Sequence, residues 1–226
     1  SRFGNLDISD DAIEAELGFR SNYQWKTDKI RKKFAAETYD EALVTSYSYR
    51  PFDCRFIYWH PAIVFNMRGG KLDLFRSSTA PIGLLFSRTT TKDTYTNFFV
   101  TRTIPDMQVL YNTKVAPLAV QDIDQNQGAL LPGSEKFIVN LSDLFVRKIA
   151  VEIGRPELLP DGSSELCEFA QEIFHFMYAV FYSPQFRDRY SVNLRMDYPR
   201  VPIPRSHGLF FSLAQFGEKL TALHLL

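Results

Sequence analysis

Residues 164–182 constrain the fold more than any other part of the sequence, because a helix over this range is apolar around most of its circumference. Such a helix needs other elements packed on most of its sides, since exposed apolar surface is unfavourable in water. We therefore expect it to be the central helix of the core. The apolar positions that predict this are Phe169, Ile173, Phe174, Phe176, Met177, Val180 and Phe181.

The longest uninterrupted apolar run, residues 176–182, is far shorter than the roughly 20 residues that a membrane span needs. The first residues, Ser-Arg-Phe-Gly-Asn-Leu-Asp, show no charged region followed by an apolar stretch, so they do not resemble a secretion signal. The sequence therefore predicts a cytoplasmic protein without a membrane partner.

Other helices are expected on both sides of the central one. Apolar residues at helical spacing predict helices over 141–153, 184–194 and 209–226. Near the N-terminus, helices are expected over 10–17 and 29–37, with Ser9 and Thr27 as their caps.

A run of positive charges lies in the second N-terminal helix. The run fits a solvated helix face, with a contact to a DNA backbone or a partner as the alternative. Its members are Lys29, Arg31, Lys32 and Lys33.

The middle of the chain is predicted to form strands, because segments rich in β-forming residues alternate there with turn residues. The sharpest break is at Arg50-Pro51, since Pro51 lacks a backbone donor and disfavours helical angles at Arg50. Residues 121–133 are expected to be a surface loop. Expected strands cover 44–49, 54–59, 82–87, 98–100, 108–111 and 115–120.

Together these elements predict an α+β fold, in which a mixed or antiparallel sheet with long basic loops packs on a C-terminal set of helices. Residues 1–43 are expected to form a helical N-terminal linker or edge segment. Residues 44–226 are expected to form the main domain, β-rich over 44–120 and helical over 141–226.

Catalytic motifs are missing from the sequence. Gly-rich phosphate loops, the Asn/Asp-Pro-Pro-Tyr/Phe segment of DNA amino-methyltransferases and the Glu-x-Lys of restriction nucleases do not occur. The four histidines and two cysteines are scattered, so no metal site is predicted. Cys54 and Cys167 have apolar neighbours and are predicted to be buried free thiols. We expect a chain that is not an enzyme and holds no cofactor.

Charge is distributed unevenly although the net charge is zero. Residues 45–116 contain nine basic and four acidic side chains, whereas residues 1–44 contain seven and nine, and residues 117–226 contain ten and thirteen. A basic middle on an otherwise neutral scaffold is typical of a segment that contacts DNA.

Three loops of this basic zone combine cationic side chains with glycines or hydroxyls, at 68–71, 87–92 and 101–103. Taken singly, each also fits a plain hairpin turn. Arginine is suited to guanine edges, whereas lysines and hydroxyls suit phosphates. Arg88 follows a predicted strand and is expected to read a base, while Lys71 and Lys92 are expected to contact phosphates.

The turn at 50–55 allows two interpretations. Arg50, Asp53 and Arg55 fit an ion-pair cluster that braces the turn, or they place an arginine on a DNA phosphate. Both interpretations stay open at this point. The residues predicted to bind DNA are Arg50, Arg55, Arg68, Lys71, Arg76, Arg88, Thr89, Thr90, Lys92 and Arg102.

Five ordered motifs span residues 44–226. They are Tyr49-Arg50-Pro51-Phe52-Asp53-Cys54-Arg55, Val115-Ala116-Pro117-Leu118, Tyr178–Tyr190 with its Ser183-Pro184, Asp197-Tyr198-Pro199-Arg200-Val201-Pro202, and Leu213-Ala214-Gln215-Phe216-Gly217 through Leu223-His224-Leu225-Leu226. This set resembles the C-terminal specificity domain of type ISP single-polypeptide restriction-modification enzymes. The first motif matches the family signature Tyr-Arg-Pro-Phe-Asp-x-Arg.

The resemblance implies sequence-specific recognition of double-stranded DNA. In this family the specificity domain follows a nuclease, an ATP-driven translocase and an adenine methyltransferase. Expected partners are therefore double-stranded DNA and the methyltransferase and coupler domains of the same polypeptide. S-adenosylmethionine, ATP and Mg²⁺ would serve the parent enzyme and not this chain. The alternative is a protein-docking module that positions the methyltransferase or translocase without reading bases.

Two loops depart from the family pattern, at residues 66–70 and 88–89. Loops that read different DNA targets are expected to differ, so the departures leave the family resemblance intact. They prevent base contacts from being carried over residue by residue.

Overall fold

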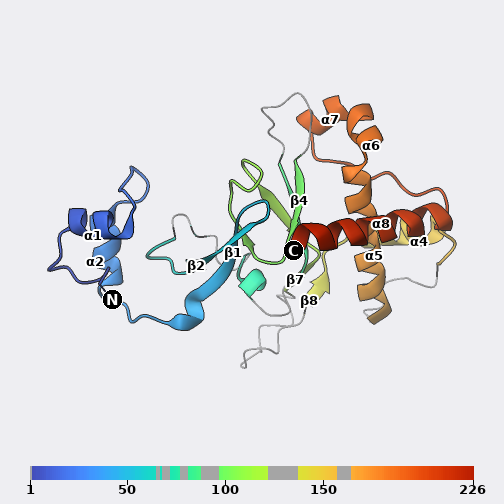
Figure 1. Ribbon diagram of the computed structural model, residues 1–226. Coiled ribbons are helices and arrows are strands. Elements are labelled where there is room, and N and C mark those ends of the chain that lie inside the picture. Colours follow the sequence, from blue (N-terminus) through green and yellow to red (C-terminus); the bar gives the residue numbers. More distant parts are fainter. Residues whose placement is uncertain are drawn as a thin grey trace. The chain divides into compact units, whose positions relative to one another are not determined.

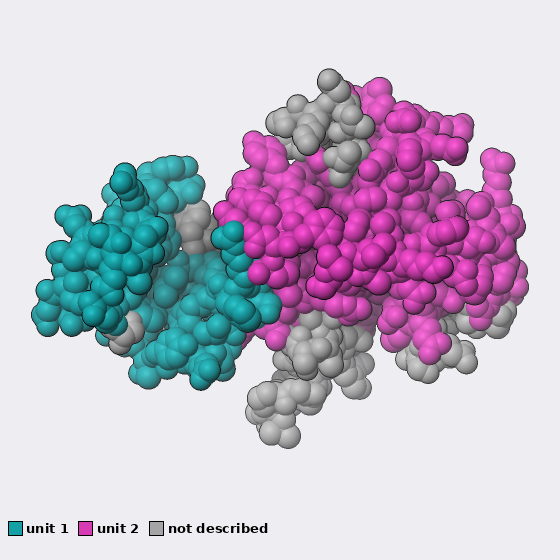
Figure 2. All heavy atoms as spheres, viewed as in Figure 1, with its two compact units in different colours: residues 1–47, 55–72 teal, residues 48–54, 73–226 magenta. Residues whose placement is uncertain are grey.

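The computed structural model in Figure 1 describes residues 2–64, 67, 72–76, 81–87, 97–121, 137–156 and 164–226. The chain divides into two compact units (Figure 2). Unit 1 consists of residues 1–47 and 55–72, and unit 2 consists of residues 48–54 and 73–226. Helices and strands are both present, and the predicted α+β class is confirmed. The domain boundary after residue 43 stays a prediction.

Unit 1 contains the helices α1 (Asp10–Leu17) and α2 (Thr27–Phe34) and the short 3-10 helix η1 (Glu41–Leu43). Ser9 caps α1 as predicted, because its hydroxyl accepts a hydrogen bond from the amide of Ala12 at 3.2 Å. The cap of α2 is Lys26, so the prediction for Thr27 is wrong. Thr27 is buried, and its hydroxyl donates to the carboxylate of Glu14 instead of capping the helix.

One arginine lies in the interior of unit 1. Arg31 is 1% exposed, so it does not belong to a solvated charge run. Its guanidinium donates to the carbonyls of Phe3 (2.9 Å), Ile8 (2.7 Å) and Asn5, and it pairs with Asp10. A buried cation needs such bonds, because removing it from water costs several kcal/mol. Among the described residues of this unit, the buried apolar side chains are Ile13, Ile30, Phe34 and Trp59.

The described strands form three small sheets, with the orders β2-β1-β5, β4-β3-β6 and β7-β8. In the second sheet, β3 pairs antiparallel with both neighbours and places Leu84 opposite Val100 and Ala116. The strands are β1 (Val44–Arg50), β2 (Asp53–Tyr58), β3 (Gly83–Phe86), β4 (Phe98–Thr101), β5 (Ile104–Pro105), β6 (Lys114–Pro117), β7 (Ala119–Gln121) and β8 (Phe137–Val139).

The C-terminal part of unit 2 is helical. Its elements are α4 (Asp143–Glu152), α5 (Ser164–Tyr182), α6 (Pro184–Arg189), α7 (Ser191–Met196) and α8 (His207–Leu225), and the short 3-10 helix η2 (Asp73–Arg76) precedes β3. No helix in the described ranges is long and apolar enough to cross a membrane.

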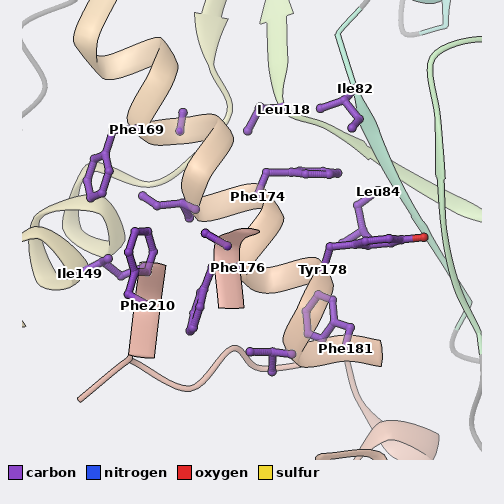
Figure 3. Close-up of a cluster of buried hydrophobic side chains, with 14 of the residues drawn as sticks. Ile82, Leu84, Leu118, Ile149, Phe169, Phe174, Phe176, Tyr178, Phe181 and Phe210 are labelled. Atoms are coloured by element: carbon purple, nitrogen blue, oxygen red, sulfur yellow. The ribbon is translucent and has the colours of Figure 1, made fainter. Parts of the chain in front are cut away.

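Helix α5 is central to unit 2, as its apolar circumference predicts (Figure 3). Its aromatic side chains belong to the same core cluster as Leu84 of β3 and Ile82, which directly precedes β3. The rings of Phe98 on β4 and Phe181 on α5 are stacked with their centroids 4.4 Å apart. The hydroxyl of Tyr182 also donates to the carbonyl of Phe98 at 2.6 Å. The sheet of the basic zone therefore packs directly on this helix.

Helices α5 and α8 approach closely at one glycine. A Cβ atom added at Gly217 would lie 1.8 Å from the carbonyl oxygen of His175 and 2.5 Å from its carbonyl carbon. Both atoms belong to backbone that is fixed by the helix, so no side-chain movement relieves the overlap. Only glycine fits at this crossing.

Three predicted elements differ from the structure. Residues 108–111 form a turn and not a strand, because Asp106 accepts from the amide of Gln108 (2.6 Å) and Tyr111 has a left-handed φ of 60°. The predicted strand 115–120 is divided at Leu118 into β6 and β7. The predicted helix 184–194 is divided at Tyr190, whose φ of −109° and ψ of 17° end α6.

The two cysteines are free, as predicted, but they are exposed and not buried. Cys54 is followed on β2 by Arg55 and Phe56, which are also exposed, so its apolar neighbour does not indicate an interior. Cys167 lies near the start of α5, before the buried stretch that begins at Phe169.

Candidate nucleic-acid interface

The turn between β1 and β2 presents Phe52 at its tip. Phe52 adopts a left-handed φ of 63° and is 61% exposed. Its ring still meets Phe99 of β4 and His224 of α8, with centroids 5.2 and 5.6 Å away. The ring thus attaches the tip of the hairpin to the core of unit 2.

His224 connects this turn to α5. Its Nδ1 atom is hydrogen-bonded to the hydroxyl of the fully buried Tyr178 at 2.6 Å, and its ring stacks on Phe99. Burial lowers the pKa of His224, and the charge of Arg187 lowers it further. Burial also raises the pKa of Tyr178, so both groups are neutral near pH 7. Three of the five sequence motifs therefore meet at Phe52, Tyr178 and His224, where they form scaffold.

The partly exposed Arg50 side chain is held by contacts with neighbouring residues of unit 2. Its Nη1 atom lies 3.5 Å from Oδ1 of Asp106 and donates to the carbonyl of Tyr49 at 2.6 Å. The guanidinium carbon lies 4.0 Å from the centroid of the Tyr49 ring. Of the two interpretations left open, bracing describes this geometry, with Asp106 as the ionic partner. A DNA contact by Arg50 stays a prediction.

Arg102 is exposed on a turn whose flanking residues are fixed. The hydroxyl of Ser48 on β1 is hydrogen-bonded to the hydroxyls of Thr101 (3.0 Å) and Thr103 (2.6 Å). The Thr101 hydroxyl also accepts from the amide of Thr103 at 3.0 Å. Ser48 and Thr101 are buried, so these bonds are shielded from competing water. We call Ser48, Thr101 and Thr103 the hydroxyl clamp.

The other described candidates differ in exposure. Arg55 lies on β2 in unit 1 and is exposed, beside the exposed ring of Phe56. Arg76 lies at the end of η2 in unit 2 and is half-buried. Arg50 ends β1, and Arg102 lies on the turn between β4 and β5, the strand that neighbours β1 in the first sheet.

Six predicted DNA-binding residues lie outside the described residues. They are Arg68, Lys71, Arg88, Thr89, Thr90 and Lys92.

Sequence reasoning missed the residues that position the arginines. Neither the bonds of Ser48 to the Arg102 turn nor the pairing of Asp106 with Arg50 was predicted from the sequence. The available signal for Ser48 was a hydroxyl residue within a strand of aromatic residues. Its partners lie more than 50 residues away along the chain, so nothing local identified them.

Metal chemistry has no visible site in the described ranges. There, no group of three or more His, Cys, Asp or Glu side chains is arranged to hold a metal ion.

Comparison with known proteins gives one family. The family model described as the Type ISP C-terminal specificity domain matches residues 5–226. No curated protein sequence matches the chain.

Solved structures share the fold. A DrdV–DNA complex is 17% identical with a TM-score of 0.68 and covers 99% of this chain. The ATP-dependent Type ISP restriction-modification enzyme LlaBIII bound to DNA is 16% identical with a TM-score of 0.60 and covers 88%. A nuclease-deletion mutant of the Type ISP enzyme LlaGI with a DNA substrate mimic is 16% identical with a TM-score of 0.57 and covers 98%. This chain spans 20%, 12% and 18% of those three chains, respectively.

Proposed function

Because the chain belongs to the family of Type ISP C-terminal specificity domains, we propose that it binds double-stranded DNA and recognises a particular base sequence. The observation that carries the proposal is the family match over nearly the whole chain, residues 5–226. Support comes from the three proteins of similar fold, which are described as bound to DNA or to a DNA substrate mimic. The chain itself performs no catalysis in this proposal.

Arg102 is the described residue best suited to reading a base. An exposed guanidinium can donate two parallel hydrogen bonds to a guanine edge in the major groove. Two parallel hydrogen bonds require that the backbone carrying the arginine is held in place. The hydroxyl clamp holds the backbone of the Arg102 turn in this way. The remaining predicted residues supply phosphate contacts or further base contacts.

The parent protein in this proposal is longer than the chain, because the chain spans only 12–20% of the solved relatives. Its other segments would include an adenine methyltransferase, a coupler, an ATP-driven translocase and a nuclease. Those segments would use S-adenosylmethionine, ATP and Mg²⁺, whereas this domain would determine which DNA sequence the enzyme recognises.

One observation favours protein docking as a second function. Leu209, Phe216 and Leu223 are spaced by seven residues on α8, and they are 48%, 65% and 62% exposed. This spacing places them on one helix face, where apolar side chains suit a contact with another domain. A module that only docks would use this face without distinguishing DNA sequences.

Selection from a library of randomised duplexes separates the two functions. The chain is mixed with the library, bound duplexes are recovered by electrophoresis over several rounds, and the recovered pool is sequenced. Sequence recognition predicts enrichment of one defined motif. A pool that retains duplexes without any enriched motif, or retains none, would remove the proposal and leave the docking function.

A further inference from the structure

The positive run on α2 separates into two faces in the structure. Arg31 faces the interior of unit 1, whereas Lys26, Lys29, Lys32 and Lys33 are all exposed. At about 100° per residue, the four lysines lie within roughly a third of the helix circumference. The opposite side of the helix carries the buried residues Thr27, Ile30, Arg31 and Phe34.

The orientation of this lysine face (Lys26, Lys29, Lys32 and Lys33) is fixed by Arg31. The Arg31 guanidinium is bonded to three backbone carbonyls and to Asp10, all in the segment from Phe3 to Asp10. Turning α2 about its axis would break these charge-assisted bonds and expose Ile30 and Phe34. The lysine face therefore points outward from unit 1 (teal in Figure 2).

The exposed Asp28 in the first turn of α2 is one acidic side chain beside the lysine face, and it offsets one of the four positive charges at most. Three other acidic side chains of unit 1 have partners outside the face. Asp10 pairs with Arg31, Glu14 accepts from Thr27, and Glu16 pairs with Arg2 at 2.9 Å. Within the described parts of the chain, none of the four lysines forms an ion pair. Three lysines on a helix of eight residues, with Lys26 at its N-cap, repel one another, and an anionic partner relieves that repulsion.

The chemistry of the face selects among anionic partners. A membrane-binding helix carries large apolar residues beside its lysines, whereas the apolar side chains of α2 are buried in unit 1. From Lys26 to Lys33 the helix rises about 10 Å. A DNA duplex presents one phosphate charge per about 1.7 Å of its axis, so every lysine of the face has phosphates within reach.

We propose that the lysine face of α2 binds the phosphate backbone of duplex DNA and adds affinity without reading sequence. The inference rests on the proposed function, because it assigns unit 1 a part in the same DNA complex. Lysine suits this role, since its flexible stem and point charge follow phosphates and do not impose the bidentate geometry of base reading.

The test compares two triple variants of the 226-residue chain on a duplex of random sequence. One variant is Lys29→Gln/Lys32→Gln/Lys33→Gln. The control, Arg147→Gln/Lys148→Gln/Lys219→Gln, removes the same number of exposed charges from α4 and α8 of unit 2. Affinity is measured across a salt series, and thermal melting confirms that both variants are folded.

The slope of log affinity against log salt decides the outcome. Each lost phosphate contact reduces the slope by about 0.9, so the α2 variant is expected to reduce it by about 2 to 3. Affinity for the random duplex is expected to fall about tenfold or more at moderate salt. The control is expected to leave the slope unchanged. Equal slopes for the wild-type chain and the α2 variant would overturn the inference. That result would leave an acidic protein, and not DNA, as the partner of the lysine face.

A second readout keeps this inference separate from the proposed function. The ratio of affinities for the selected duplex and for a scrambled one is expected to be the same in the wild type and the α2 variant, because phosphates do not differ between them. A variant that keeps the slope but loses the ratio would also overturn the inference. A wild type without discrimination would defeat the proposed function, while a reduced slope in the variant would still support the lysine face.

Discussion

Unit 1 buries an arginine among a few apolar side chains, whereas unit 2 buries an extended set of aromatic and aliphatic side chains around α5. In unit 1 the position of α2 depends on hydrogen bonds from Arg31 to backbone carbonyls. In unit 2 the positions of α5 and α8 depend on apolar packing and on a close approach at Gly217. The spacing of apolar residues therefore predicts the helices of unit 2 well, but it does not indicate that unit 1 is organised around a buried arginine.

The chain offers separate probes for the two units. Both tryptophans, Trp25 and Trp59, belong to unit 1, so tryptophan fluorescence reports on that unit. The long helices α5 and α8 belong to unit 2 and dominate the helical circular dichroism. Substitutions in one unit are expected to move one signal and leave the other in place.

The largest expected effect is that of Gly217→Ala. The new Cβ would overlap the backbone of His175, so α5 and α8 must separate and the core between them must loosen. We expect a loss of about 3–5 kcal/mol in the free energy of unfolding of unit 2. Urea unfolding followed by circular dichroism measures this loss, with tryptophan fluorescence as the internal reference.

Gly208→Ala is the matched control on the same helix, because nothing lies within 4 Å of the Cβ that it would add. Its effect is expected to stay within about 1 kcal/mol. Equal effects of the two substitutions would contradict the close helix crossing.

A somewhat smaller effect is expected for Arg31→Met in unit 1. The substitution keeps a long apolar stem but leaves Asp10 and the carbonyls of Phe3, Asn5 and Ile8 without their donor. Loss of one partner from a buried ionic network costs about 3 kcal/mol. Urea unfolding followed by tryptophan fluorescence should show this loss while the helical signal of unit 2 is retained.

Lys32→Met provides the comparison for Arg31→Met, because Lys32 is the exposed neighbour on the same helix. It should leave the fluorescence transition in place. If Arg31→Met instead shifted both signals together, the two units would unfold as one and the comparison between them would fail.

The two units are also expected to differ in their response to acid. Burial lowers the pKa of His224 and of His175 in unit 2, so the folded state prefers both rings neutral. Their contribution is complete above the ordinary value of 6.5 and is lost as the pH falls below it. In unit 1, hydrogen bonds from Thr27 and Ser21 lower the pKa of Glu14.

Glu14 therefore contributes above its ordinary value of 4.5, and its contribution is lost only as the pH falls below that value. Between these two values, unit 2 should lose stability in urea titrations while unit 1 does not. His224→Gln should weaken this acid sensitivity. An identical pH dependence of the fluorescence and circular dichroism midpoints would contradict the assignment.

The smallest effect on stability is expected for Arg102→Ala, because the hydroxyl clamp holds the turn without the Arg102 side chain. The free energy of unfolding should change by less than about 0.5 kcal/mol. DNA affinity should fall by about 1–3 kcal/mol, with preference relaxed at one position of the target. Lys148→Ala on α4 serves as the control for a lost surface charge.

Selection with the Arg102→Ala chain measures this preference directly. An unchanged motif combined with weaker binding to all duplexes would place Arg102 on phosphate. Base reading would then belong to another of the predicted residues.

The helices of unit 2 were predictable because apolar spacing and turn residues agree with the fold. The predicted range 164–182 coincides with α5, and α8 begins two residues before the predicted position 209. The failures have local causes. Val109 gives residues 108–111 the appearance of a strand, but the Asp106 side chain and the left-handed Tyr111 close a turn there. Tyr190 leaves helical angles although helical residues lie on both sides of it.

The candidate site was less predictable, because its geometry depends on contacts between distant residues. The sequence identified Arg102 between two threonines, but it did not show that Ser48 fixes both of them. Equally, a charge run such as that of α2 does not reveal which member faces inward. Arg31 is distinguished from its lysine neighbours only by the carbonyls that the fold brings to it.

Sequence discrimination by the chain alone is the central claim. The decisive measurement is the ratio of the dissociation constants for the selected duplex and a scrambled duplex of the same composition, determined at physiological salt. A specific DNA-binding domain is expected to show a ratio of about a thousand or more, because base contacts are lost on the scrambled duplex while phosphate contacts remain. A ratio near one at every salt concentration would contradict the account.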